Sequence, residues 1–465
     1  MEEIRVFKLR DYQLKTINKI YDSIKSGHKK IIVQQPPRTG KTVIMAEIAR
    51  RTALKGNRLL FLIHRKEVLE QAINTFKQQE VDMELATMGM VQTLYRKVNR
   101  LPEPQLILID EAHHAAAKTY QTILNAFPNA FVLLFTATPI RTGKKQLDQV
   151  ADDIIVGESI KNLISQGYLA NFKYFARKDV DTKKLKKSST GDFTNASMEE
   201  AVSTKIYGHV LDNYLRIAKG KQAVVFTYSV ESAKRIAKQF NSAGITAEEL
   251  DGNTDTATRE SIVNDFRNKK ITILVNVNLF TEGVDLPDVD CVIMTRPTAS
   301  LALYLQFSMR CLNPRKGKTA IIIDHVGNYE RFGLPNSERD WRTAIVTKDK
   351  KTKKKQQNDS LSIVQCDFCF RVFERSDVKN GTCPGCGNPI KVRKTPEVTN
   401  DQLQEVIQDR KNLVEKIISD NTKLAIAGKK LSELHTYKEL KAYADLHGYR
   451  PGWIFYQLKN RKRGH

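Results

Sequence analysis

One stretch constrains this chain more than any other, because it joins a strand pattern to a helix pattern through a Gly-Lys-Thr turn. Residues 34–42 follow the apolar run 31–33 and precede a helical apolar pattern over residues 43–49. In such a turn, backbone N–H groups and the helix N-terminus surround phosphate oxygens, which is the arrangement of an NTPase phosphate loop. The usual pattern begins with Gly where this chain has Gln35, so other motifs have to support the prediction.

Each position of this loop carries an expected role. Lys41 is expected to reach the β and γ oxygens of a nucleotide, and Thr42 to offer its hydroxyl to Mg²⁺. The preceding loop residues Arg38, Thr39 and Gly40 are also expected to contact the nucleotide. These assignments predict a Mg²⁺-dependent nucleotide site.

A second motif supplies two carboxylates directly after a strand pattern. Four aliphatic residues, 106–109, run into Asp110-Glu111-Ala112-His113. Buried carboxylates are costly unless they have partners, so a purely structural role is unfavourable here. Asp110 is expected to hold Mg²⁺ through its water shell, and Glu111 to polarise the attacking water. With the phosphate loop upstream, this pair predicts an NTPase.

Charge and composition narrow the partner class. The chain has 465 residues and a formal net charge of +24, so we expect two to four domains and a polyanionic partner. Nucleic acid is the first candidate, although a merely soluble basic protein has the same composition. The chain begins without an apolar signal region, and no apolar run reaches membrane-spanning length. We therefore expect a soluble, cytoplasmic protein with no membrane partner.

Four of the six cysteines form two C-x-x-C pairs with thirteen residues between them. Four thiolates at this spacing can close a tetrahedral Zn²⁺ site, which would be structural because no position stays open. A redox dithiol is the alternative, and the second pair argues against it. The predicted zinc ligands are Cys366, Cys369, Cys383 and Cys386.

Four motifs together resemble the DEAH-type superfamily 2 helicases. These are Gln13, the phosphate loop, the Asp-Glu-Ala-His stretch and Thr-Ala-Thr-Pro at residues 136–139, and the resemblance covers about residues 9–328. It implies an α/β fold with two tandem RecA-like domains, ATP as the nucleotide, and Gln13 at the adenine edge. Asp-His-Val-Gly-Asn at 324–328 and His-Gly-Tyr-Arg-Pro-Gly-Trp at 447–453 most resemble the RadD-like branch.

The resemblance also assigns residues in the second RecA-like domain. It places Gly283 and Asp285 at the nucleotide, and Gln306 and Arg310 among the catalytic residues. The last family motif reads Q-x-x-G-R-x-x-R, but here Met309 replaces Gly and Asn313 replaces the final Arg. That Arg would bring positive charge to the γ-phosphate. Arg315 could take its place, and so could Arg38, which stands where relatives have Gly; Arg38 could equally be an exposed turn residue.

Nucleic-acid contacts are expected at residues 64–67 and 91–94, which resemble contacting motifs of the superfamily. The resemblance favours DNA over RNA, with single-stranded or branched DNA as substrate and single-strand-binding or replication proteins as partners. The predicted function is an ATP-dependent DNA helicase or translocase acting in replication, recombination or repair. A nucleic-acid-binding module with a weakened ATPase, and a duplex translocase that does not separate strands, are the alternatives.

The predicted domain layout follows these motifs and the changes in composition. The basic run at 183–187 suggests an exposed connection, and six lysines between 348 and 355 suggest a linker. Helical patterns after the cysteines predict a C-terminal helical tail. The expected parts are RecA-like domain 1 (1–168), a basic connection (169–204), RecA-like domain 2 (205–345), a Lys-rich linker (346–362), a zinc module (363–392) and a helical C-terminal domain (398–465).

Overall fold

The computed structural model divides the chain into two compact units, residues 1–390 and 391–465, which are described separately. The described residues are 6–112, 115, 117–139, 151–177, 179–188, 191–202, 206–277, 289–342, 363–390, 426, 429–449 and 452–461. Among them, no helix is both long enough and apolar enough to cross a membrane.

The first sheet has six parallel strands in the order β3-β2-β4-β5-β1-β6. Strands β1 and β4 both pair parallel with β5, so Gln34 and Ile109, which end these strands and lie 75 positions apart (109 − 34), are at the same edge of the sheet. The strands are β1 (Lys30–Gln34), β2 (Leu59–Ile63), β3 (Ala86–Met90), β4 (Leu106–Ile109), β5 (Phe131–Thr136) and β6 (Asp153–Val156).

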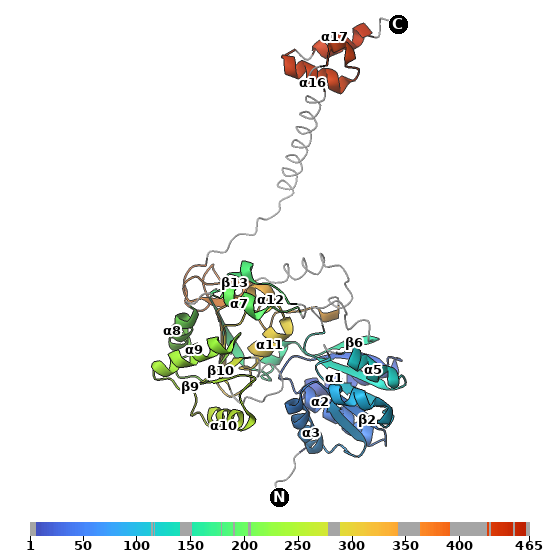
Figure 1. Ribbon diagram of the computed structural model, residues 1–465, viewed down its shortest axis with the longest axis vertical. Coiled ribbons are helices and arrows are strands. Elements are labelled where there is room, and N and C mark those ends of the chain that lie inside the picture. The colour runs from blue at the N-terminus through green and yellow to red at the C-terminus, as the bar shows by residue number, and fades with distance from the viewer. Residues whose placement is uncertain are drawn as a thin grey trace. The chain divides into compact units, whose positions relative to one another are not determined.

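Helices cover both faces of this sheet (Figure 1). Along β4, Leu106 and Leu108 face one apolar cluster, whereas Ile107 and Ile109 face the other. Successive side chains of a strand point to opposite faces, so a run of four aliphatic residues fits a sheet buried on both sides. The helices are α1 (Asp11–Lys25), α2 (Lys41–Ala53), α3 (Lys66–Gln78), α4 (Val91–Leu94), η1 (Tyr95–Arg100), α5 (Lys118–Ala126) and α6 (Ile160–Ser165).

The second sheet has eight strands in the order β13-β14-β7-β12-β11-β8-β10-β9. The six strands from β7 to β9 in this order are parallel to one another. Strand β14 pairs antiparallel with both of its neighbours, β13 and β7. The two sheets confirm the predicted α/β fold with tandem RecA-like domains. The strands are β7 (Asn171–Ala176), β8 (Ala223–Thr227), β9 (Ala247–Leu250), β10 (Ile273–Val277), β11 (Cys291–Met294), β12 (Thr319–Asp324), β13 (Ile363–Gln365) and β14 (Arg371–Glu374).

Helices also flank the second sheet, and its two faces alternate in the same way. In β8, Ala223 and Val225 contribute to one apolar cluster, and Val224 and Phe226 contribute to the other. The helices are η4 (Thr182–Lys184), α7 (Asn195–Ala201), α8 (Ile206–Ile217), α9 (Val230–Ser242), α10 (Thr256–Arg267), α11 (Leu301–Met309), α12 (Asn328–Phe332) and η5 (Arg375–Asp377).

The basic connection predicted at residues 169–204 is not separate from the second RecA-like domain, although Lys183, Lys184, Lys186 and Lys187 within it are exposed as expected. Its first part is β7, which pairs along its whole length with β12 inside the second sheet. Farther on, Phe193 and Met198 are buried in the apolar cluster beneath α8 and α9. The lysine run is polar, but the apolar residues on either side of it are drawn into the core, because their burial stabilises the second domain.

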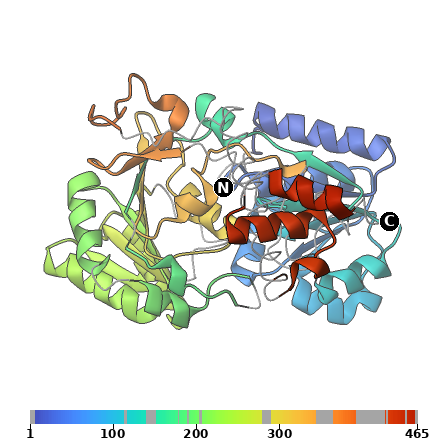
Figure 2. The same cartoon turned by 90° about the horizontal axis from the view of Figure 1, so that it is seen from above.

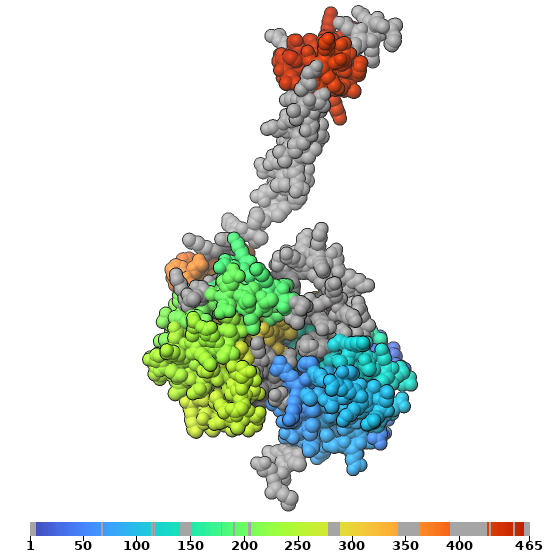
Figure 3. All heavy atoms as spheres, viewed as in Figure 1, coloured from blue at the N-terminus to red at the C-terminus, as the bar shows by residue number. Residues whose placement is uncertain are grey.

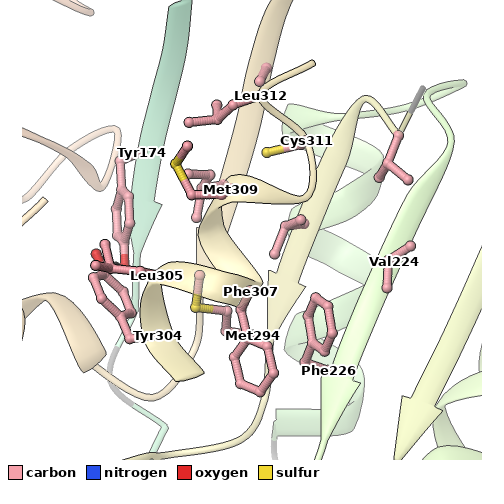
Figure 4. Packing of buried hydrophobic residues seen from close by; sticks show 14 of the residues in the cluster. Tyr174, Val224, Phe226, Met294, Tyr304, Leu305, Phe307, Met309, Cys311 and Leu312 are labelled. Carbon is pink, nitrogen blue, oxygen red and sulfur yellow. Dashed lines mark hydrogen bonds between the residues drawn. The ribbon is translucent and has the colours of Figure 1, made fainter. Parts of the chain in front are cut away.

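Helix α11 packs tightly against the second sheet, and Figure 4 shows this contact. Phe307 stacks on Phe226 of β8 with ring centroids 4.1 Å apart. Met309, which stands where relatives have Gly, is fully buried in the same cluster. Its departure from the family pattern is therefore accommodated as core packing.

The second unit contains η6 (Leu431–Glu433), α16 (Tyr437–His447) and α17 (Gly452–Arg461). The aromatic residues of this segment, Tyr443, Trp453 and Phe455, are consistent in sequence with a small pair of helices packed through their rings. Tyr443 and Trp453 do stack, with ring centroids 6.0 Å apart, but Phe455 is exposed. Leu434 and Leu440 supply the buried contacts instead. Residues 398–425 of the predicted helical C-terminal domain lie outside the described residues.

Candidate nucleotide and zinc sites

The phosphate loop connects β1 to α2, as its sequence predicts. Gly40 is the N-cap residue of α2 and has a φ of 73°, a left-handed conformation that favours glycine. A Cβ atom at this position would lie 2.6 Å from Nε2 of Gln13. Glycine is therefore required here both by the backbone conformation and by the close approach of α1. Lys41 and Thr42 form the first turn of α2, whose N–H groups face the loop.

Gln13 holds α1 against this loop. Its Nε2 donates to the Thr39 carbonyl at 3.1 Å, and its Oε1 accepts from the Arg10 amide at 2.9 Å. The Tyr12 hydroxyl donates to the same Thr39 carbonyl at 2.8 Å. Thr39 is itself buried, and its hydroxyl donates to the Pro36 carbonyl. Gln13 thus lies beside the nucleotide loop, as expected, and its contact with adenine stays a prediction.

The two predicted catalytic motifs meet at the carboxyl edge of the first sheet. Lys41 Nζ lies 3.0 Å from Glu111 Oε1, and both side chains are largely buried. Asp110 is 5% exposed, and its Oδ1 accepts the Glu111 amide at 2.9 Å. Glu111 has a φ of 47°, an uncommon conformation for a residue other than glycine. A lysine, two carboxylates and the Thr42 hydroxyl form a donor set that fits Mg²⁺ and nucleotide phosphates. His113 lies outside the described residues.

Arg38 connects the two RecA-like domains. Its Nε donates to Asn313 Oδ1 at 2.7 Å, although the two residues are 275 positions apart. Arg38 has a φ of 61°, a left-handed backbone conformation that glycine would adopt without strain. Arg315, the other candidate, pairs instead with Asp290 at 2.7 Å and is 44% exposed. The contact favours Arg38 over Arg315 as the cation nearest to Asn313.

The remaining predicted residues of the second domain fall in two groups. Gln306 on α11 and Arg310 immediately after it are both 8% exposed, and the packing of this helix holds them in place. Gly283 and Asp285 lie outside the described residues, so their contact with nucleotide stays a prediction.

The two segments expected to contact nucleic acid in the first domain lie together. Gln92 Nε2 lies 2.6 Å from His64 Nδ1, and it also donates to the His64 carbonyl. These residues follow β2 and β3 at the same edge of the sheet. Their contact with nucleic acid stays a prediction.

Asp192 is a residue that sequence reasoning missed. Its Oδ1 accepts the Ala299 amide at 2.6 Å and the Thr298 hydroxyl at 2.9 Å, and its Oδ2 lies 3.2 Å from Arg296. Burial lowers the pKa of Arg296, against the opposing effect of the Asp192 carboxylate. Asp192 therefore orders the loop after β11. The only signal in the sequence is that Asp192 is an acidic residue within a basic segment.

A histidine that directly follows a core strand is expected to be structural, and the structure places His325 in the core. It is fully buried, and its Nδ1 lies 3.0 Å from Asp179 Oδ2. His209 contacts the other oxygen of Asp179 at 2.8 Å. Burial raises the pKa of Asp179, but hydrogen bonds from the two histidines outweigh it and leave that pKa below its usual value.

The four cysteines form a compact cluster within residues 363–390. Their sulfur atoms all lie within 4.8 Å of one another, and two of the distances, Cys366 to Cys386 and Cys369 to Cys383, are 3.7 Å. A tetrahedral site with Zn–S bonds of about 2.3 Å requires sulfurs roughly 3.8 Å apart, so the cluster fits Zn²⁺.

Local contacts prepare part of this cluster for metal binding. Hydrogen bonds from Asn388 lower the pKa of Cys386 to about 6. Burial raises the pKa of Cys369 to about 12, so this thiol has to lose its proton when a metal binds. The Gly385 amide donates to Cys383 Sγ at 3.3 Å. The Cys-Pro-Gly-Cys turn at residues 383–386 therefore brings a backbone N–H to one of the sulfur atoms.

Two RecA-like domains, with a phosphate loop that meets an Asp-Glu pair, define an ATP-dependent helicase or translocase. Two family models match the chain: the res subunit of type III restriction enzymes at residues 6–141, and the helicase conserved C-terminal domain at residues 207–314. The chain belongs to the superfamily 2 helicases, in one family with the 51.5 kDa protein of a Lactococcus phage (isolate 7-9), to which it is 35% identical over 84% of each chain.

Other relatives share the motor region. The chain is 31% identical to the putative ATP-dependent helicase IRC3 of Saccharomyces cerevisiae, over 69% of this chain and 51% of that protein. It is 28% identical to the DNA 3'-5' translocase XPB2 of Sulfurisphaera tokodaii, over 49% and 59% respectively. This chain therefore matches only about half the length of these two relatives. A fragment of a putative HsdR subunit of a type I restriction enzyme from Vibrio vulnificus shares the fold, with a TM-score of 0.55, 21% identity, and coverage of 70% of this chain and 66% of that one.

Proposed function

We propose that this protein couples ATP hydrolysis to movement on, or remodelling of, DNA during replication, recombination or repair. The observation that carries the proposal is the contact between Lys41 and Glu111, because it joins the phosphate loop to the residue expected to activate water. DNA as the track is supported by the name of the translocase relative and by the net charge of +24. RNA is the less favoured polymer.

ATP binding is proposed to make Glu111 available as a base, because the nucleotide takes over its contact with Lys41. In the structure the Lys41 ammonium pairs with the Glu111 carboxylate at 3.0 Å, so each side chain has a partner that a bound phosphate could replace. A γ-phosphate carries more negative charge than one carboxylate, so it competes for Lys41 and releases Glu111 to accept a proton from the attacking water. Thr42 and Asp110 would hold Mg²⁺, which neutralises charge on the phosphates.

Arg38 is proposed to supply the positive charge that relatives bring from the position of Asn313. Its guanidinium lies in the phosphate loop and contacts Asn313 across the domain interface. Asn313 would then position Arg38 when the domains close on ATP. This assignment leaves Arg315 outside the site, because that side chain pairs with Asp290.

Four finer assignments belong to the same proposal. The stretches at 324–328 and 447–453 support a place in the RadD-like branch. The cysteine cluster is proposed to bind one structural Zn²⁺. A cytoplasmic location, and partnership with single-strand-binding or replication proteins, are proposed together with the action on DNA.

A series of DNA substrates distinguishes a helicase from a duplex translocase and from a binding module with a weakened ATPase. ATP turnover is measured with single-stranded, duplex and forked DNA, and each substrate is also followed for strand separation and for displacement of a third, triplex-forming strand. A helicase separates forks, whereas a duplex translocase displaces the third strand without separating the duplex. Binding of DNA with no stimulated turnover would favour the weakened-ATPase module, the alternative that Asn313 motivates.

A further inference from the structure

A hollow of about 630 Å³ lies where residues 363–390 meet the second RecA-like domain. β14 adds to the sheet beside β7, and the loop between the first two cysteines closes one side of the hollow. In Figures 2 and 3 the orange segment that contains β13 and β14 lies at the surface of the second domain. A volume of this size falls within the range of ligand sites, about 300–1,000 Å³.

The charge of this hollow has one sign. Lys173 on β7, Arg216 on α8 and Lys221 before β8 line it, and its lining contains no carboxylate. None of these three side chains forms an ion pair with any residue in the described ranges of the chain. Lys219 and Lys316, next to the lining in sequence, are exposed. Such a concentration of positive charge attracts a polyanion.

Aromatic residues accompany the charges. Phe368 lines the hollow and is 60% exposed, which is unusual for so large an apolar side chain. Phe175 lies on the same face of β7 as Lys173 and lines the hollow as well. The Arg216 guanidinium lies 5.4 Å from the centre of the Phe370 ring. Exposed aromatic rings beside cations are the features that bind single-stranded nucleic acid.

The position of Phe368 is fixed by the fold. It lies between Cys366 and Cys369, and the Phe370 amide donates to the Cys366 carbonyl at 2.9 Å. The Ala176 amide donates to the Phe370 carbonyl at 2.9 Å, which fastens this loop to β7. The ring is therefore presented by a turn that is held at both the cysteine cluster and the sheet.

We propose that this hollow is a second docking site for single-stranded nucleic acid, in which a base stacks on Phe368 and phosphates contact Lys173 and Lys221. Lys221 precedes β8 and Thr319 begins β12, so the hollow lies toward the amino ends of these parallel strands. The loop ordered by Asp192 follows β11 at the opposite edge. The inference rests on the proposed nucleic-acid substrate and adds a contact outside the motor track.

The test measures binding of a labelled oligothymidylate to the full chain without nucleotide, by fluorescence anisotropy over a series of salt concentrations. Stacking contributes about 1–3 kcal/mol per base, so Phe368→Ala should weaken binding about fivefold or more, whereas Phe368→Tyr should retain it. Lys173→Ala with Lys221→Ala should make the slope of log affinity against log salt shallower by about 1.4, at roughly 0.7 per phosphate contact. Arg216 is left intact because it packs over Phe370.

The matched control removes two charges elsewhere on the same domain. Lys234→Ala with Lys238→Ala on the exposed side of α9 should leave the salt slope unchanged. If Phe368→Ala binds within twofold of the parent, and the slope for Lys173→Ala with Lys221→Ala equals that of the control, the docking site is refuted. Such a result alongside DNA-stimulated turnover would leave the motor intact. If these variants of the hollow lose binding but the parent shows no DNA-stimulated turnover, the proposed motor function is refuted and the docking site is retained.

Discussion

Replacing Arg38 by Gly should change the free energy of unfolding only slightly but lower the rate of ATP hydrolysis strongly. Arg38 holds a left-handed backbone conformation with a φ of 61°, which costs a residue other than glycine about 1–2 kcal/mol. Its hydrogen bond to Asn313 at 2.7 Å contributes about 1.5–3 kcal/mol at most, as a bond from a charged donor. The two effects largely cancel in Arg38→Gly, so the free energy of unfolding should fall by only about 1 kcal/mol.

Turnover should change far more than stability. An arginine that stabilises charge on a transferring phosphoryl group contributes about 10³- to 10⁵-fold in related enzymes, so we expect kcat of Arg38→Gly to fall at least about 100-fold. The affinity for ATP should change much less, because the contact matters most in the transition state. Steady-state hydrolysis with saturating DNA and denaturant unfolding of the same samples measure the two quantities.

Two further variants identify the compensating residue. Arg315→Ala is the matched control, because Arg315 pairs with Asp290 on an exposed surface, and its kcat should stay within about twofold. Asn313→Arg in the Arg38→Gly background restores the arrangement of relatives and should recover part of the lost turnover. If Arg38→Gly turns over like the parent, Arg38 does not act on the phosphate and the reasoning is refuted.

Three other perturbations are informative. Metal analysis should find about one zinc per chain, and Cys383→Ser should lose the zinc and the protease resistance of residues 363–390, whereas unchanged zinc content would contradict the site. Arg310→Ala should lower kcat by a large factor with modest loss of ATP affinity, and a parent-like kcat would remove it from the catalytic set. Hydrogen bonds from Arg50, Arg51 and Gln79 outweigh burial and lower the pKa of Glu47 to about 2 from 4.5. The ionised Glu47 should therefore contribute on the order of 2 kcal/mol to the free energy of unfolding, after allowing for solvent around the arginines. This contribution should be present above about pH 4.5 and lost as the pH falls toward 2. Unfolding of the parent and Glu47→Gln should therefore differ most near neutral pH, and a constant difference down to pH 2 would contradict this.

Local patterns made the centre of the site predictable. A strand, a Gly-Lys-Thr turn and a helix are contiguous, so residues 31–49 specify their own geometry. Asp110 and Glu111 follow a run of aliphatic residues, which places them at a strand end. The spacing of the cysteines likewise limits how their thiols can gather. Each of these inferences needed only neighbouring residues and the geometry of one strand, helix or turn.

The remaining features depend on contacts between distant segments. Nothing in the sequence joins Arg38 to Asn313, because that contact exists only when two domains have folded and met. Asp192 was overlooked because its role comes from the loop at 296–299. A signal for β7 was present, since apolar residues recur at every second position in Phe172, Tyr174 and Ala176. The basic residues that follow it hid this short strand within a segment interpreted as a connection.

DNA-stimulated ATP hydrolysis by this protein is proposed to depend on both Lys41 and Glu111, with Lys41 on the phosphates and Glu111 as the base for water. The most direct test is ATP turnover by the parent, Lys41→Ala and Glu111→Gln, each with and without saturating single-stranded DNA. Turnover of the parent should rise with DNA. Lys41→Ala should lose hydrolysis because the phosphates lose their lysine, and Glu111→Gln should bind ATP without turning it over because an amide cannot accept the proton from water. Near-parental, DNA-stimulated turnover in either variant would contradict the account.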